Sequence, residues 1–179
     1  MKNNSIIEVA LLGGKGTIGS GLRKFLPKIN PNYSFTVVDY AQSIDKSDVV
    51  NSNEVFINLD ISNDQEKLSE VLLDKDLIIY LARKDPLNEM NKMTDLVFKT
   101  AEKFNPNALI IGSSSVHATG GAYFPFLKEP YKTIASREFN KLKTWPKLLN
   151  ANIEPCPTGD YGLEKAYVCL LYTSDAADE

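Results

Sequence analysis

The sequence predicts an α/β fold in which a doubly wound parallel sheet carries helices on both faces. Short runs rich in Ile, Leu and Val alternate with segments of helical apolar spacing along most of the 179 residues, and such alternation is typical of crossover units. The runs at 77–82 and 109–111 are almost continuously apolar, as expected of strands that are buried on both faces. A hydrophobic content of 43% over this length supports a single sizeable core.

The expected strands are short and bounded by polar or turn residues: 6–12, 34–39, 54–58, 77–82 and 108–112. The expected helices lie between them: 17–26, 64–73 and 89–104. Pro27 should end the first helix because proline has no amide hydrogen to donate, and Pro106 follows the end of the third. The segment 120–154 is irregular, and we expect an insertion beside the active-site face that contains a helix around 134–142.

A glycine-rich turn follows the first expected strand and opens the first helix: Gly13-Gly14-Lys15-Gly16-Thr17-Ile18-Gly19. Glycines let the backbone turn tightly and approach phosphates closely, and the helix N-terminus offers N–H groups and a positive dipole end. Asp39 closes the next strand, where a carboxylate can bind ribose hydroxyls. Strand, turn, helix and carboxylate together predict a Rossmann-type dinucleotide site.

The same residues bear on which dinucleotide is bound. Lys15, inside the turn, could meet a 2′-phosphate and so favour NADP. Asp39 would repel a phosphate there and hydrogen-bond a free 2′-hydroxyl instead. We therefore expect NAD as the cofactor, in preference to NADP.

With the pair Tyr161-x-x-x-Lys165 added, residues 6–168 resemble the extended short-chain dehydrogenase/reductase family, the NAD-dependent epimerase/dehydratase group. Tyr80 stands where that family usually has a histidine. The resemblance implies these cofactor contacts: Gly13, Gly14, Gly16, Thr17, Ile18, Gly19, Asp39, Asp60, Ile61, Leu81, Ala82 and Lys165. It also implies a truncated Rossmann-type fold that stops before the C-terminal substrate-binding part.

The resemblance implies hydride transfer at a sugar carbon, with Tyr161 as the acid/base and Lys165 as its electrostatic partner. A tyrosine takes a hydroxyl proton only when its phenol pKa falls from about 10 towards neutrality. A lysine four positions later lies on the same helical face, where its charge favours the tyrosinate. It can also hold the nicotinamide ribose.

The third catalytic group is a serine from the run Ser113-Ser114-Ser115. Ser114 matches the second serine of the family's pair. Ser115 matches instead if His117 is aligned with the Ser-Ser-x-His pattern of hexuronate dehydrogenases. Tyr161 follows these serines at a longer distance than is usual, because the segment 120–154 intervenes.

The sequence thus predicts an NAD-dependent oxidoreductase, epimerase or dehydratase acting on a nucleotide sugar or related sugar. Two alternatives stay open. One is a sugar or uronate dehydrogenase that releases NADH. The other is a non-catalytic NAD(P)-sensing protein on the same fold, although proteins of that kind typically lack the Tyr/Lys pair.

Composition argues against other classes of partner. The net charge is −3 without a cluster of Lys and Arg, so neither nucleic acid nor an acidic membrane surface is expected to bind. The apolar runs are too short to span a bilayer, and the N-terminus lacks a signal-peptide pattern. We expect a cytoplasmic protein with no metal site, because two cysteines without ligand spacing do not indicate one. A small-molecule sugar is the expected partner, with a homodimer as an option for the full-length form.

The last eleven residues, 169–179, resemble a translated sequencing-adapter oligonucleotide. We expect them to be a non-native tail. Residues 1–168 would then form an incomplete NAD(P)-binding domain, and this fragment alone is expected to be inactive.

Overall fold

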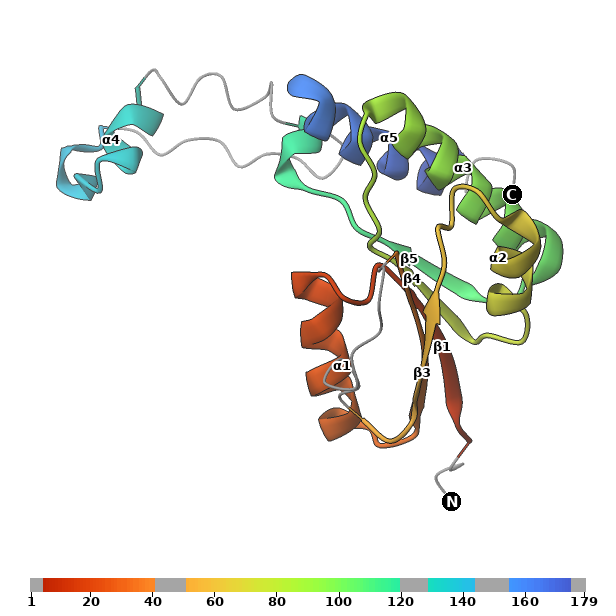
Figure 1. Ribbon diagram of the computed structural model, residues 1–179. Coiled ribbons are helices and arrows are strands. Elements are labelled where there is room, and N and C mark those ends of the chain that lie inside the picture. The colour runs from red at the N-terminus through yellow and green to blue at the C-terminus, as the bar shows by residue number, and fades with distance from the viewer. Residues whose placement is uncertain (1–4, 41–50, 120–128, 144–154, 175–179) are drawn as a thin grey trace. The chain divides into compact units, whose positions relative to one another are not determined.

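A computed structural model describes residues 5–40, 51–119, 129–143 and 155–174 of the chain (Figure 1). The chain divides into two compact units, Met1–Ser113 and Ser114–Glu179. Each is described by itself below. Among the described residues, no helix combines the length and the apolar character needed to cross a membrane.

Five parallel strands form the sheet of the first unit: β1 (Ile7–Leu12), β2 (Tyr33–Asp39), β3 (Glu54–Asn58), β4 (Leu77–Tyr80) and β5 (Leu109–Gly112). Their order is β3-β2-β1-β4-β5. The chain moves outward from β1 to β3, returns to the other side of β1 with β4, and ends at β5. This is a doubly wound parallel sheet, so the expected α/β fold class is confirmed.

Alternate residues of the strands face two separate apolar layers. On one face, Val9 and Leu11 of β1 and their neighbours pack against Leu22 and Leu26 of α1 (Thr17–Ile29). On the other face, residues such as Ala10 and Leu12 belong to a core shared with α2 (Gln65–Leu72) and α3 (Leu87–Phe104). Figure 1 shows α1 on one side of the sheet and α2 with α3 on the other. Burial on both faces explains why β1 and β4 are almost continuously apolar. The expectation that the run at 109–111 is buried on both faces is wrong, because β5 is the last strand of the described sheet and leaves Leu109 and Ile111 exposed.

The first helix continues past Pro27 to Ile29, so the prediction that it ends at Pro27 is wrong. Proline cannot donate the hydrogen bond that would reach the carbonyl of Arg23, four residues earlier. The side-chain amide of Asn51 donates to that carbonyl at 2.7 Å. Because a tertiary contact supplies the missing donor, the helix can keep its last turn.

The second unit contains α4 (Tyr131–Ala135), a 3₁₀ turn η3 (Phe139–Lys141) and α5 (Gly159–Ser174). The expected helix over 134–142 is wrong, because Arg137 has a left-handed φ of +58° that interrupts helical geometry. The rest of the expected insertion, at 120–128 and 144–154, lies outside the described residues. Helix α5 carries the Tyr161/Lys165 pair and extends into the segment predicted to be a non-native tail, whose origin stays a prediction.

Candidate functional site

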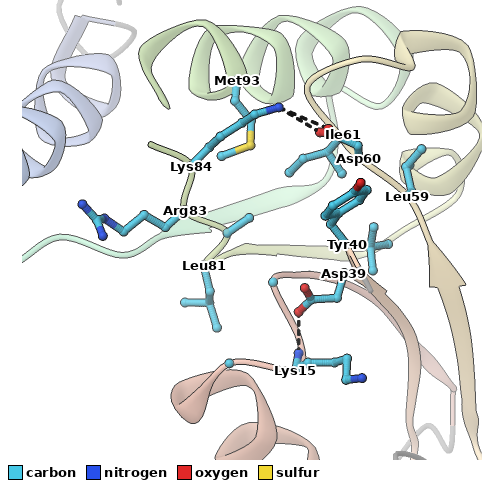
Figure 2. A pocket seen from close by; sticks show the side chains of 14 residues that line it. Lys15, Asp39, Tyr40, Leu59, Asp60, Ile61, Leu81, Arg83, Lys84 and Met93 are labelled. Atoms are coloured by element: carbon cyan, nitrogen blue, oxygen red, sulfur yellow. Dashed lines mark hydrogen bonds and ion pairs between the residues drawn. The ribbon is translucent and has the colours of Figure 1, made fainter. Parts of the chain in front are cut away.

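A cavity of about 570 Å³ opens at the carboxyl ends of the strands of the first unit (Figure 2). In a doubly wound sheet this is where ligands bind, close to the point at which the strand order reverses. It is lined by residues that end or directly follow β1, β2, β3 and β4, with one from α3: Gly13, Lys15, Gly16, Val38, Asp39, Tyr40, Leu59, Asp60, Ile61, Leu81, Ala82, Arg83, Lys84 and Met93. Four successive strand ends therefore converge on one cavity.

Three glycines of the turn are required by the protein's own packing. Gly13 has φ +85°, and a Cβ there would lie 2.6 Å from the backbone nitrogen of Ala82. A Cβ on Gly14 would meet the side chain of Val37 at 2.5 Å, and one on Gly19 would lie 2.7 Å from Gly14 Cα. The turn thus lies tightly between β1, β4 and α1, which no larger residue would permit.

Gly16 differs from the other three glycines. A Cβ on it would meet only the carbonyl oxygen of Gly13, at an ordinary 3.4 Å. It lines the cavity and is the N-cap of α1, where no side chain caps the helix. Packing within the protein does not require a glycine at position 16. A bound anionic group lying close to the helix N-terminus would require one, because a side chain there would keep the group away. The turn therefore fits a dinucleotide pyrophosphate.

Asp39 lies at the cavity and also holds the turn. Its Oδ2 accepts a hydrogen bond of 2.8 Å from the backbone N–H of Lys15 (Figure 2). The Lys15 ammonium lies 5.7 Å from the centroid of the Phe56 ring. Although Oδ2 of Asp39 accepts this bond from the protein, a carboxylate has further lone pairs and can still accept hydrogen bonds from a hydroxyl group of a ligand.

Asp60, at the next strand end, is the centre of a polar network. Its Oδ1 accepts from the Ser62 hydroxyl at 2.6 Å, and its Oδ2 accepts from the Lys84 ammonium at 3.1 Å and from Asn63 at 2.8 Å. Lys84 also donates to Ser62. Figure 2 shows Lys84 reaching Asp60, whereas Arg83 extends in another direction. Burial alone would raise the pKa of Asp60, but the hydrogen bonds from Ser62 and Lys84 together outweigh it and leave the pKa below its ordinary value.

This network predicts an acid-sensitive contribution to stability. A carboxylate whose folded pKa is depressed stabilises the protein above its unfolded pKa and loses that effect as the pH falls through the folded value. The destabilisation caused by Asp60→Asn, relative to wild type, should therefore be full at pH 7 and shrink as the pH falls below about 4. Urea unfolding of both proteins at pH 7 and pH 3 measures it. An equal difference at the two pH values would contradict the prediction.

The structure places the other predicted cofactor residues as follows. Ile61, Leu81 and Ala82 line the cavity, whereas Thr17 and Ile18 are exposed at the start of α1 without lining it. Tyr80 does not line it: its ring is buried in the core shared with α2 and α3, and its hydroxyl lies 3.0 Å from the hydroxyl of Thr94.

Sequence reasoning missed six of the lining residues: Val38, Tyr40, Leu59, Arg83, Lys84 and Met93. Four of them are adjacent to predicted residues at strand ends, and Lys84 lies two residues after Ala82, so their position relative to the strands was a usable signal. Met93 lies on α3, and nothing in its local sequence distinguishes it from a core methionine.

In the second unit, α5 presents the tyrosine and lysine on one face. The Lys165 ammonium lies 5.5 Å from the centroid of the Tyr161 ring, and 39% of the Tyr161 residue surface is exposed. Lys165 is buried and forms an ion pair of 2.9 Å with the buried Glu164. The lysine is therefore held beside the phenol ring and is electrostatically balanced by its own neighbour in sequence.

The serine run divides between the two units. Ser113 belongs to the first unit, whereas the Ser114 hydroxyl contacts α5: it donates to the carbonyl of Lys165 at 3.3 Å and lies 2.9 Å from Cys169 Sγ. The Ser115 hydroxyl lies 3.0 Å from His117 Nδ1.

The imidazole of His117 packs edge-on against Tyr161, with ring centroids 5.2 Å apart and an interplanar angle of 74°. A Cβ on Gly162 would lie 2.6 Å from the His117 carbonyl oxygen, so the backbones approach closely at this point. The unit thus brings Ser115, His117, Tyr161 and Lys165 into one cluster. The described residues contain no group of three or more His, Cys, Asp or Glu placed to hold a metal ion.

No protein-family model matches the sequence, and no curated protein matches it. Solved structures are similar in fold. A glucuronic acid dehydrogenase from Chromohalobacter salexigens aligns with a TM-score of 0.66 and 17% identity, over 94% of this chain and 55% of the other. A dTDP-glucose 4,6-dehydratase from Bacillus anthracis, in complex with NAD, aligns with a TM-score of 0.70 and 16% identity, over 96% of this chain and 51% of the other. A UDP-glucuronic acid 4-epimerase from Bacillus cereus, also in complex with NAD, aligns with a TM-score of 0.65 and 19% identity, over 94% of this chain and 53% of the other. The chain spans about half the length of these proteins.

Proposed function

We propose that this chain is the dinucleotide-binding part of an NAD-dependent oxidoreductase, epimerase or dehydratase of the extended short-chain dehydrogenase/reductase family. Its substrate would be a nucleotide sugar or a related sugar. The observation that carries the proposal is the cavity at four strand ends, with the glycine turn and two carboxylates, Asp39 and Asp60, on its walls. The similar solved structures include NAD complexes of enzymes named for sugar substrates, which supports it.

In this proposal, different residues of the cavity bind different parts of the cofactor. Gly13 and Gly16 with the N-terminus of α1 would hold the pyrophosphate, and Asp39 would accept hydrogen bonds from the adenosine ribose. Asp60 and Ile61 would lie beside the adenine. The apolar residues Leu81 and Ala82 would line the remaining path of the cofactor.

The second unit supplies the acid/base chemistry of the proposal. When bound, NAD would accept a hydride from the sugar carbon. Tyr161 would take the proton of the sugar hydroxyl, and the charge of Lys165 would favour the tyrosinate. A serine hydroxyl would steady the substrate oxygen: Ser114 by its match to the family pair, or Ser115, whose hydroxyl lies at His117.

A binding measurement tests the cofactor assignment. The chain is expected to bind NAD at least about tenfold more tightly than NADP, because a 2′-phosphate beside Asp39 places like charges together. Asp39→Asn should reduce this preference, since it removes the charge. Isothermal titration calorimetry with both dinucleotides gives the two dissociation constants.

Asp39→Asn is the informative variant because its amide oxygen can still accept the hydrogen bond from Lys15 N–H. Asp39→Ala would remove that bond as well and loosen the turn. Tighter binding of NADP by the wild-type chain would overturn the assignment and identify Lys15 as the 2′-phosphate ligand.

A sugar or uronate dehydrogenase that releases NADH is the second candidate. The contact of His117 with both Ser115 and Tyr161 favours it, because the Ser-Ser-x-His pattern of hexuronate dehydrogenases is then placed at the proposed acid/base. Net production of NADH from NAD and a hexuronate would support the second candidate, whereas sugar turnover without net NADH would support the first. A non-catalytic NAD(P)-sensing protein is disfavoured by the closely packed Tyr161 and Lys165.

A further inference from the structure

Arg23 is a charged side chain on the face of α1 that packs towards the sheet. Only 2% of its surface is exposed. Removing a guanidinium from water is costly unless hydrogen bonds and an opposite charge compensate. The partners of Arg23 therefore show what this charge does in the fold.

Glu54, at the start of β3, is the charged partner. Arg23 Nη2 lies 2.8 Å from Glu54 Oε2, and Arg23 Nε lies 3.2 Å from Glu54 Oε1. The Glu54 side chain is 1% exposed, and the Asn51 amide donates to its Oε1 at 2.8 Å. This two-point geometry fixes the plane of the guanidinium, since its N–H groups lie in one rigid fork.

The remaining side of that fork reaches the glycine turn. Arg23 Nη1 donates to the carbonyl oxygen of Gly14 at 3.3 Å. The N–H of the same peptide unit belongs to Lys15 and donates to Asp39 Oδ2 at 2.8 Å. The Gly14–Lys15 peptide unit is thus held at both ends. Buried Arg23 binds its carbonyl oxygen, and Asp39, at the cavity, binds its N–H.

We propose that Arg23 is a positioning residue for dinucleotide binding, which acts through the Gly14–Lys15 peptide without contacting the ligand. With the guanidinium fixed by Glu54, the peptide keeps one orientation, and the N–H groups of the turn are arranged before the ligand arrives. Such preorganisation raises affinity because less ordering remains for the ligand to induce. This inference rests on the proposed dinucleotide-binding function.

The double variant Arg23→Met/Glu54→Leu separates positioning from stability. Replacing both members of a buried ion pair by apolar residues of similar volume is often neutral for stability. Positioning predicts that the dissociation constant for NAD rises about tenfold, and that amide hydrogen exchange at Lys15 accelerates about tenfold without ligand. A second variant, Arg23→Lys, keeps a charge for Glu54 but lacks the fork that reaches Gly14, and it should show the same direction of change. It decides the question if the double variant does not fold.

Leu68→Ala is the matched control. It lowers stability through a cavity in the core that α2 and α3 share, on the face of the sheet opposite to α1. NAD affinity and Lys15 exchange should remain at wild-type values in this variant. If folded Arg23→Lys or the double variant binds NAD within about twofold of wild type and Lys15 exchange is unchanged, Arg23 is a purely structural residue and the inference is overturned. Failure of wild type to bind NAD would refute the proposed function, and the exchange at Lys15 would still decide whether Arg23 positions the turn.

Discussion

Replacing Tyr161 with phenylalanine is expected to lower kcat by at least about a hundredfold, the usual contribution of a positioned acid/base. The change deletes only the ionisable oxygen and leaves the ring that packs against His117 and lies beside Lys165. Affinity for NAD should therefore stay within about twofold of wild type. Turnover is measured in a form of the protein that spans the length of the similar solved enzymes, and NAD binding is measured by calorimetry.

Lys165→Ala is the companion variant, and it should damage both turnover and NAD affinity, because the proposal gives its ammonium two tasks. Its loss also leaves the buried carboxylate of Glu164 without the ammonium 2.9 Å away. The double variant Glu164→Gln/Lys165→Met therefore controls for the cost of an uncompensated buried charge. Wild-type turnover in Tyr161→Phe would show that the acid/base is wrongly assigned and would favour the non-catalytic NAD(P)-sensing protein.

Two glycine substitutions in one turn should give opposite results. Gly13→Ala is expected to lower the free energy of unfolding by about 2–4 kcal/mol, because the new Cβ meets backbone atoms of Ala82 and φ is +85°. Gly16→Ala should cost no more than about 1 kcal/mol, since its Cβ would have ordinary contacts. Urea denaturation monitored by circular dichroism measures both.

Gly16→Ala should have a small effect on stability but a large effect on NAD binding. Although its alanine variant should fold, a methyl group at the N-cap of α1 would keep the pyrophosphate away from the helix N-terminus. We therefore expect NAD affinity to fall by about tenfold or more in Gly16→Ala. Unchanged NAD affinity in a folded Gly16→Ala protein would show that the phosphate does not approach this residue.

The parts of the fold that depend on local pattern could be predicted from the sequence. All five strands lie within two residues of their expected bounds, because each is a short apolar run that ends at polar residues. The glycine turn and Asp39 were recognisable because their spacing follows from the strand–turn–helix geometry itself. Gly13, Lys15 and Gly16 of the turn lie with Asp39 on the walls of the cavity, whereas Gly14 and Gly19 do not line it.

Long-range side-chain contacts were not predictable in this way. Arg23 lies in a helix, where an arginine is ordinarily solvent-exposed. Its partners are distant in sequence: Glu54 follows it by 31 residues, and the Gly14 carbonyl precedes it by nine. Lys84 reaches Asp60 across 24 residues, because parallel strands bring their carboxyl ends to one edge. The helix expected at 134–142 failed for a different reason, since side-chain composition does not reveal the left-handed backbone at Arg137.

The hydrogen bond from Asn51 to the carbonyl of Arg23 has a consequence for how the chain folds. It joins Arg23, whose carbonyl would otherwise bond to the residue at position 27, to a residue 28 positions later, three residues before the start of β3. Helix formation is ordinarily a local event, but here Pro27 makes the final turn depend on a contact that forms only after a long loop has closed. Completion of α1 and docking of β3 therefore belong to the same cooperative step, and α1 should be frayed at its C-terminal end until that step occurs.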